Sequence, residues 1–566
     1  MRTLRPDTAT RHLCAGVYLD RNFRTQVLHQ VHNDTRHMIA PSYGFDLVPV
    51  VRHAWRAWRL EHVQHTAVLL IVVTGWAVNP PALIGAGCAI GMVAFARLAL
   101  VNGGALVREQ AKARADEFLH RVRWRSETDA LREHKRLIRV GLTGLIVLML
   151  LPFVVSALHG TPAGHMLRLA ALLTLLLATV VVIRATSVRI YLGALQSADR
   201  LDGRMSARLA DIARQEKHPV VVYTRAAPPS KKQSRRGRTT PSLEEEEKPE
   251  PLLEQGVSPF VGAGFLVHRW LPPVVIQLKD KVTKLDLDSP RFEPHELVGE
   301  LRRSIVLVGD PRGSEALPGF RVADRLFVAE EDITEPRPWL SQAPDPTEID
   351  DVIDRPYGLR HHFLEITTSA TGEVVTTVFL RVTVKGGTLS IDFAACALTR
   401  TPTELHLSDR HGAMRPGEVV RTVLLALADL PREIASVVRL GSGIKTATGA
   451  LRAIRHARDG RPATTGPRLS VRENRSTPWK RAELDKVLVL DHMKVIELHL
   501  FKTIEVFLDD RKIDIEDLTE RAASIINAGV LNMGGRVEIN DSAVGPNSQY
   551  RNDVRDDGRP GEGAHE

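Results

Sequence analysis

Four long apolar runs dominate the first third of the chain. They cover residues 63–78, 82–101, 138–158 and 166–188, and short breaks at 79–81 and 159–165 group them in pairs. As helices, the longer runs match a bilayer core of about 30 Å, whereas the first, with 16 residues, reaches only about 24 Å. We therefore expect an α-helical membrane unit of four spans arranged as two hairpins.

Charge predicts the orientation of these spans. Residues 102–137, between the hairpins, contain nine Lys and Arg residues, whereas neither break within a hairpin contains one. Basic loops stay on the cytoplasmic side of a membrane. The N-terminal 60 residues contain no apolar run typical of a cleavable signal peptide. We expect a plasma-membrane (cell inner membrane) protein with both termini in the cytoplasm, targeted by its first span.

Charged residues are rare within the runs themselves. The arginines within them include Arg97, Arg168 and Arg184, and no Asp, Glu or Lys lies mid-span. Arginines near helix ends reach the headgroups, so we interpret them as anchors, and the missing acidic groups argue against an ion-coupled transporter. Gly87 and Gly91 form a small-xxx-small pattern, which fits packing within the first hairpin or a homodimer.

Periodicity and composition divide the chain into ten expected segments. The α+β assignment rests on β-rich runs at 361–368, 374–384 and 388–396, joined by Gly-containing turns, which predict a three-stranded antiparallel meander. The segments are: 1–62, N-terminal amphipathic helices; 63–101, first transmembrane hairpin; 102–137, basic helical loop; 138–188, second hairpin; 189–223, helical extension; 224–256, disordered charged linker; 257–457, cytoplasmic α+β domain with an antiparallel sheet; 458–480, linker; 481–540, C-terminal helical segment; 541–566, disordered tail.

Composition narrows the classes of partner. The net charge is +9, but many basic residues flank the apolar runs, where they favour anionic lipids over nucleic acid. The three cysteines, Cys14, Cys88 and Cys396, lie far apart and form neither a disulfide framework nor a Cys-based metal site. We expect the lipid bilayer and an unknown protein as partners, and no nucleic acid.

No motif in the sequence assigns a reaction. Residues 305–313 begin like a strand entering a phosphate loop, but the Gly-Lys-Ser/Thr end is missing. Histidines cluster locally, but without the Glu or Cys of a metal motif, so we interpret them as polar surface residues. These histidines are His29, His32, His37, His62, His65, His361 and His362. We therefore assign no catalytic, cofactor-binding or metal-binding residue.

Two short stretches resemble a group of known sequences. Residues 42–49 (SYGFDLVP) and 259–264 (PFVGAG) resemble stretches in uncharacterised multi-pass membrane proteins of high-GC actinobacteria. The resemblance implies a multi-pass inner-membrane protein and no activity.

The pattern as a whole favours an integral membrane protein that holds a cytoplasmic interaction or regulatory domain at the inner leaflet. Two alternatives remain open. A small transporter or pore would require a polar stripe through the spans. A membrane-tethered enzyme would require converging titratable groups within residues 257–440, and the sequence leaves enzymatic activity undecided.

Overall fold

The computed structural model describes most of the chain. The described residues are 8–120, 129–158, 160, 162–197, 203–224, 259–310, 313, 316–335, 337–406, 416–460 and 462–531. Residues 225–256 of the expected linker and the expected tail at 541–566 lie outside this set.

Four long helices form what we call the helical unit: α3 (Leu47–Val78), α4 (Pro80–His120), α5 (Asp129–Leu158) and α6 (Ala163–Ser197). Asn79 separates the first two, and its side chain accepts the Ala82 N–H at 2.9 Å, capping α4 just before Pro80 and Pro81. Residues Pro80–Ala111, Arg132–Leu158 and Gly164–Leu195 are long and apolar enough to cross a membrane. The described residues thus contain three such helices, and α3 is not among them.

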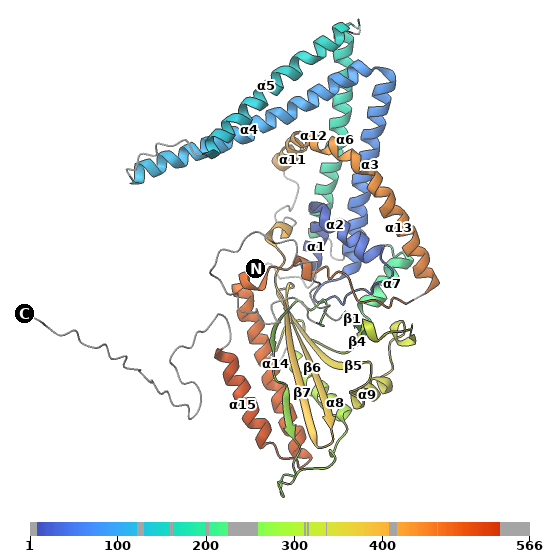
Figure 1. Ribbon diagram of the computed structural model, residues 1–566, viewed down its shortest axis with the longest axis vertical. Coiled ribbons are helices and arrows are strands. Elements are labelled where there is room, and N and C mark those ends of the chain that lie inside the picture. The colour runs from blue at the N-terminus through green and yellow to red at the C-terminus, as the bar shows by residue number, and fades with distance from the viewer. Residues whose placement is uncertain are drawn as a thin grey trace, which may run out of the picture.

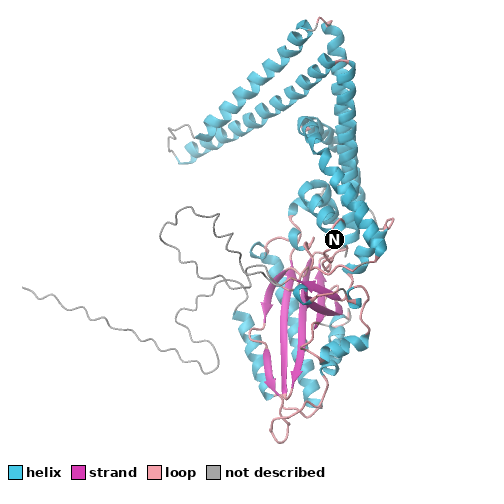
Figure 2. Ribbon diagram, turned by 45° about the vertical axis from the view of Figure 1, so that its right-hand side comes forward, coloured by secondary structure: helices cyan, strands magenta, loops and turns pink. Residues whose placement is uncertain are grey.

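The helices of this unit do not pair in the order of the sequence. α4 packs mainly against α5 and also contacts α6, whereas within this unit α3 packs mainly against α6. Figure 1 shows α3 and α6 rising together from the rest of the molecule, while α4 and α5 run away together at an angle. The α3–α4 and α5–α6 turns both lie at the end of the unit farthest from the sheet (Figures 1 and 2).

Short helices pack around the base of α3 and α6. They are α1 (Thr8–Leu19), α2 (Arg21–Gln26), η1 (Val27–His32) and α7 (Ala207–Glu216). Their apolar faces share one core with the first turns of α3 and the last turns of α6, including Phe23, Val50 and Leu195. The amphipathic stripes of the N-terminal segment are therefore buried against protein.

Strands between residues 220 and 398 build a curled, mixed sheet, which is seven-stranded within the described residues. Its order is β1-β4-β5-β6-β7-β2, with β3 also paired to β7. The strand pattern in the sequence predicts an antiparallel sheet. This prediction is wrong at one edge, because β1 pairs parallel with β4. The strands are β1 (Val220–Tyr223), β2 (Phe265–Arg269), β3 (Val274–Gln277), β4 (Arg321–Ala329), β5 (His361–Ala370), β6 (Val374–Lys385) and β7 (Thr388–Leu398).

The predicted three-stranded meander is confirmed as β5–β6–β7. Gly386 turns the chain between β6 and β7 with a positive φ. Thr371 and Gly372 do the same between β5 and β6, and Thr371 is a β-branched residue that rarely adopts this conformation. The β5–β6 turn is therefore held by its surroundings, and it carries the candidate site described below.

Different parts of the chain cover the two faces of the sheet. On one face, α8 (Pro294–Val306), α14 (Glu483–Asp510) and α15 (Glu516–Leu531) complete the largest core, and α9 (Pro346–Asp354) packs beside α8. A smaller aromatic core, with Phe260, Phe327 and Phe379, includes Tyr43 from the N-terminal segment. The sheet thus shares a core with residues that precede α3.

Between β7 and α14 the chain leaves the sheet and returns to the helical unit. This returning segment, residues 416–459, contains α11 (Pro416–Ala428), α12 (Leu430–Ala435), η8 (Ser436–Arg439) and α13 (Leu440–Asp459). α11 and α12 pack against α4 and α6, and α13 packs against α3 and α7. In Figure 1 the segment is orange and lies beside the helices that rise from the sheet.

Candidate functional site

Four polar side chains converge where α1 meets one end of the sheet. His12 lies on α1, Glu373 ends the β5–β6 turn, Thr401 follows β7, and His406 ends the short helix η7 (Thr403–His406). His12, Glu373 and Thr401 are buried, and His406 is partly exposed. Three segments that are distant in the sequence thus bring their polar groups to one point.

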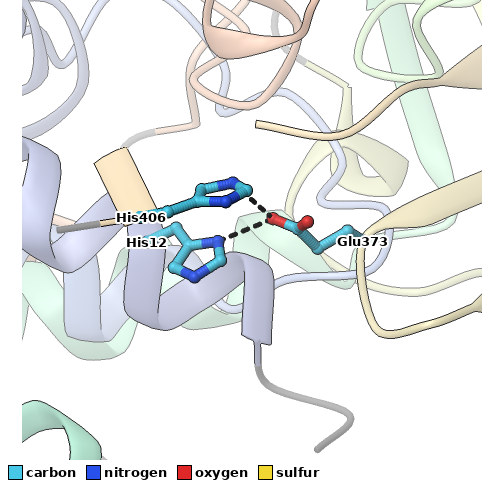
Figure 3. Close-up of side chains that lie close together, drawn as sticks. All are labelled: His12, Glu373 and His406. Carbon is cyan, nitrogen blue, oxygen red and sulfur yellow. Dashed lines mark hydrogen bonds and ion pairs between the residues drawn. The ribbon is translucent and has the colours of Figure 1, made fainter. Parts of the chain in front are cut away.

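The shared point is one carboxylate oxygen of Glu373. His12 Nδ1 lies 2.7 Å from Glu373 Oε1, and His406 Nε2 lies 3.7 Å from it. The Thr401 hydroxyl donates to the same oxygen at 2.5 Å and lies 3.0 Å from each of the two ring nitrogens. Figure 3 shows the two rings, stacked with centroids 4.1 Å apart, turning their nitrogens toward the carboxylate.

Local backbone geometry explains how Glu373 reaches this position. The left-handed residues Thr371 and Gly372 reverse the chain directly before it. The Ala9 N–H at the start of α1 donates to the Gly372 carbonyl at 3.2 Å, which docks the helix on the turn. Because Ala9 and His12 are three residues apart, both face the sheet from one side of α1.

The cluster has a defined electrostatic balance. Burial raises the pKa of the Glu373 carboxyl, but the hydrogen bonds from His12 and Thr401 and the nearby charges of His12 and Arg472 outweigh it and lower the pKa to about 2. Glu373 is therefore a carboxylate at neutral pH. Arg472 is fully buried, and burial lowers the pKa of its guanidinium to about 10 although Glu373 and Asp485 oppose this.

Arg472 contacts the main chain beside the site and makes no hydrogen bond to the Glu373 carboxylate. Its Nη2 donates to the main-chain carbonyls of Glu373, at 2.8 Å, and Thr399, at 2.7 Å. Nε and Nη1 have no hydrogen-bond partner among the described residues. Arg472 thus ties the turn to the end of β7 and leaves the carboxylate oxygens of Glu373 to the histidines and Thr401.

The neighbouring Glu473 explains one of the two stretches singled out by resemblance. Its carboxylate accepts the N–H groups of Gly262, at 3.2 Å, and Gly264, at 3.1 Å. Burial raises the pKa of Glu473, and these hydrogen bonds oppose the shift. A Cβ on Gly262 would lie 2.5 Å from the Pro41 carbonyl oxygen and 3.5 Å from the Tyr43 ring, so residues 259–264 pack beside the start of the other stretch.

The donor set permits two kinds of chemistry. Two imidazole nitrogens and one carboxylate form a common ligand set for zinc and for other first-row transition metals. The same atoms can also act without an ion as a charge-assisted hydrogen-bonded cluster that joins α1 to the sheet. His12, Glu373 and His406 form the one group of three possible metal ligands within the described residues.

The histidines considered in the sequence analysis lie elsewhere. His29 contacts the Thr446 hydroxyl at 3.0 Å, His65 contacts Ser436 at 2.7 Å, and His362 contacts Asp324 at 2.9 Å. His37 lies 2.9 Å from Asp34, and His32 is buried beside Arg208. None of these belongs to a group of three potential ligands in the described part of the chain.

Sequence reasoning missed the site because no local spacing marks it. His12 and Glu373 are 361 residues apart, and His406 is a single histidine at the end of the short helix η7. The one available signal was the Ala-Thr-Gly turn at 370–372, which placed an acidic residue directly before a strand.

A second polar cluster joins the returning segment to the helical unit. Arg97 of α4 binds the Asp429 carboxylate and donates to the Ala428 carbonyl at 3.0 Å. Arg184 of α6 pairs with Glu433 at 2.8 Å. Arg189 binds Glu418 and lies 2.8 Å from the Thr422 hydroxyl.

These pairs change the interpretation of two arginines in the apolar runs. Arg97 and Arg184 were assigned to headgroup anchoring, and in the structure both meet carboxylates of the returning segment. Arg168 is exposed near the N-terminal end of α6.

Comparison with known proteins identifies one domain. Residues 272–539, slightly less than half of the chain, match the family model of the AbeC-like domain. No curated protein and no solved structure matches the chain. The matched range contains β3–β7, α14, the returning segment and three residues of the candidate site, whereas His12 and the membrane-type helices lie outside it.

Proposed function

We propose that this chain is a multi-pass protein of the plasma membrane in which four helices hold the sheet and its AbeC-like domain at the inner leaflet as an interaction or regulatory module. The observation that carries the proposal is the set of ion pairs between the helical unit and the returning segment. These pairs make the domain a fixed partner of the membrane helices, so a change in one can be transmitted to the other.

The proposed orientation places both termini in the cytoplasm. The strongly basic stretch at 102–137 supports this because positive loops remain on the inner side. The two uncharged turns lie together at the end of the helical unit away from the sheet (Figure 1). A membrane crossing the unit near that end would leave the turns outside and the sheet inside.

We assign the upper half of α3 as the fourth span. One side of residues 63–78 carries exposed apolar side chains, including Leu70, Val73 and Trp76, which are 57 to 62% exposed. Apolar surface of this extent is stable against lipid and unfavourable in water. The stretch is short at about 24 Å, and α3 continues below it into the buried N-terminal core, which fixes its depth.

The ion pairs also favour a membrane boundary at the returning segment. Arg97 and Arg184 lie near the inner ends of their apolar runs, where unpaired charge is unfavourable. Asp429, which lies between α11 and α12, and Glu433 of α12 neutralise them, while Val420, Leu424 and Leu425 of α11 remain more than half exposed. We therefore propose that α11 lies in the inner interface with this apolar face in the acyl chains.

Anionic phospholipid is the partner best supported by surface chemistry. A groove of about 560 Å3 between α4 and α5 is lined by Phe95, Val140, Val147 and Leu148 and ends at Arg136 and Arg139. Neither arginine has an ion-pair partner among the described residues. Residues 136–148 of α5 span about 18 Å, close to one leaflet of a core of about 30 Å, so one acyl chain with its phosphate at the arginines fits.

The coupling can be tested with the full-length chain in lipid nanodiscs. Asp429→Asn combined with Glu433→Gln removes the two carboxylates and leaves Arg97 and Arg184 unpaired. We expect amide hydrogen exchange in α11 and α12 to accelerate at least about tenfold, equivalent to about 1.4 kcal/mol. The matched control is Asp459→Asn, on the exposed end of α13 in the same segment.

Unchanged exchange in the double variant would contradict the coupling. Orientation is tested separately by reporter fusions in the intact chain. A fusion after Gly160 should appear outside, and fusions after Glu127 and Glu566 should appear inside. An outside signal at Glu127 would contradict the four-span arrangement.

A further inference from the structure

We propose that His12, Glu373 and His406, with Thr401 beside them, bind one divalent transition-metal ion, for which Zn2+ is the best fit, and that the ion fastens α1 to the sheet. The proposal rests on the side-chain geometry of the cluster alone. It holds whether or not the sheet serves as a regulatory module.

The separations between the donor atoms suit a small ion. The three ligand atoms of His12, Glu373 and His406 all lie within 4.8 Å of one another. Ligands at about 2.0–2.2 Å from a tetrahedral zinc ion lie about 3.3 Å apart. The distances from Glu373 Oε1 to the two ring nitrogens, 2.7 Å and 3.7 Å, bracket this value.

The chemistry of the donors selects the class of metal. Imidazole nitrogen suits zinc and its first-row neighbours, whereas Mg2+ and Ca2+ prefer sites built from oxygen. Glu373 supplies the single negative charge, and Thr401 lies within 3.0 Å of both ring nitrogens. The set leaves a fourth position for water or the Thr401 hydroxyl.

The surroundings hold the donors in place and leave a path of entry. The Thr371–Gly372 turn and the two Arg472 hydrogen bonds fix the main chain around Glu373. Arg472 contacts main-chain carbonyls, so it competes for none of the ligand atoms. The His406 side chain is 26% exposed, which opens one side of the cluster to solvent while His12 stays buried.

A cluster without an ion makes a different prediction. In that case His12 Nδ1 keeps its proton and donates to Glu373, as the 2.7 Å contact allows. An ion would replace that proton and separate the nitrogen and the carboxylate to about 3.3 Å. The two states therefore differ in whether they take up metal, and metal uptake can be measured directly.

The experiment uses the full-length chain, purified without a polyhistidine tag, treated with chelator and titrated with Co2+ as a spectroscopic probe. We expect saturation at one ion per chain, visible absorption of a four- or five-coordinate site, and displacement of that absorption by one equivalent of Zn2+. Absence of saturable binding by the wild-type chain would overturn the proposal.

Variants locate the site. Because His406 is partly exposed, His406→Gln is the change least disruptive to folding, and Glu373→Gln retains the size of the side chain. Loss of a group that only hydrogen-bonds to a metal ligand weakens metal binding by roughly 10–100-fold. Each of these variants should weaken Co2+ binding by more than that. His456→Gln on α13 is the matched control and should bind as the wild type does.

Wild-type binding by His406→Gln and Glu373→Gln would overturn the assignment of the ligands. Thermal unfolding adds a readout of the fastening role. Zn2+ should raise the unfolding temperature of the wild type and of His456→Gln, and it should leave that of His406→Gln unchanged. An equal rise in all three would also overturn the proposal.

Discussion

The helical unit contains two pairs of helices that are stabilised by different means. α3 and α6 meet at a base rich in paired charges, where Glu61 binds Arg24 and lies 3.2 Å from Arg21. α4 and α5 meet through small residues, since Gly141 and Gly144 lie against Ala99 and Phe95 of α4. Charge pairing fixes α3 to the short helices at the base, whereas α4 and α5 pack closely against one another through small residues, and α4 also contacts α6, α11 and α12.

The largest effect is expected at the charged base. Glu61 is 4% exposed, so Glu61→Gln leaves two arginines, one of them buried, without their carboxylate. Breaking a buried pair in this way costs about 3–5 kcal/mol of folding free energy. Urea unfolding of the detergent-solubilised full chain should show this loss for the N-terminal core.

A control distinguishes this loss from a general effect of removing charge. Glu300→Gln removes the partner of Arg303 from a pair on the exposed side of α8. Surface pairs contribute about 0–1 kcal/mol, so this variant should unfold close to the wild type. Equal losses in the two variants would remove the distinction between the charged base and an ordinary surface pair.

The packing between α4 and α5 should be sensitive to side-chain volume rather than to charge. A Cβ on Gly144 would lie 2.6 Å from the Phe95 ring, so Gly144→Val forces α4 and α5 apart. Overpacking typically costs about 1–3 kcal/mol. Gly87→Val is the control, because a Cβ there has no neighbouring atom within 4 Å.

Hydrogen exchange in nanodiscs would measure this change helix by helix. We expect faster exchange in α4 and α5 of Gly144→Val, and no change in α3 and α6. Faster exchange confined to α3 and α6 would contradict the pairing of α4 with α5.

The sequence predicted the apolar segments of this unit and paired them as two hairpins, and this pairing is wrong, because α4 packs mainly against α5 of the other hairpin. A run of Leu, Val and Ala indicates that a helix faces lipid, but it contains no information on which neighbouring helix it contacts. The Gly87–Gly91 pattern was assigned to packing within the first hairpin or to a homodimer. In the structure Gly91 faces Leu148 of α5, in the other hairpin, and Gly87 is open.

The sheet was predictable in its most local part only. Alternating residues and Gly-containing turns were sufficient for β5–β6–β7, where each strand pairs with its sequence neighbour. β1 pairs with β4 across about a hundred residues, and no local pattern marks that parallel contact.

The same lesson applies to the candidate site. His12, Glu373 and His406 come together through the docking of α1 on a turn, which is a tertiary event. Tyr43 similarly donates to Glu365 at 2.8 Å, within the aromatic core of the sheet. Both contacts join the N-terminal segment to the sheet, so a fragment beginning at residue 257 would lack part of that core.

Acid should weaken the base of α3 and α6 before it affects the α4–α5 pair. Burial, opposed by the Asn33 hydrogen bond and aided by Arg208, lowers the pKa of His32 to about 4. Burial, together with the nearby charges of Arg56 and Arg52, also lowers the pKa of His53 to about 4. The His53 ring contacts the Tyr18 hydroxyl. The unfolded chain binds these protons near pH 6.5, so stability is complete above that pH and is lost as the pH falls toward 4.

This pH dependence can be followed by hydrogen exchange at pH 7 and pH 5, corrected for the intrinsic exchange rate. We expect α1 and the first half of α3 to lose protection at pH 5, while α4 and α5 retain it. The double variant His32→Gln, His53→Gln should abolish the difference between the two pH values. A difference that persists in this variant would assign the pH response to other groups.

The smallest effect is expected at the groove between α4 and α5. Arg136→Gln with Arg139→Gln removes the charges at its inner end and leaves its apolar walls unchanged. Each basic residue near an anionic surface contributes about 1 kcal/mol, so the variant should lose most of its preference for anionic over zwitterionic lipid. Arg168→Gln is the control, since it removes one positive charge from an exposed site on α6 that does not line the groove.

Native mass spectrometry of the chain, released from vesicles with and without phosphatidylglycerol, would count the lipids retained. Inorganic phosphate should not compete for the site, because the groove binds the acyl chain as well as the headgroup. Equal retention by the double variant and the wild type would show that α4 and α5 bind lipid through their apolar surface alone.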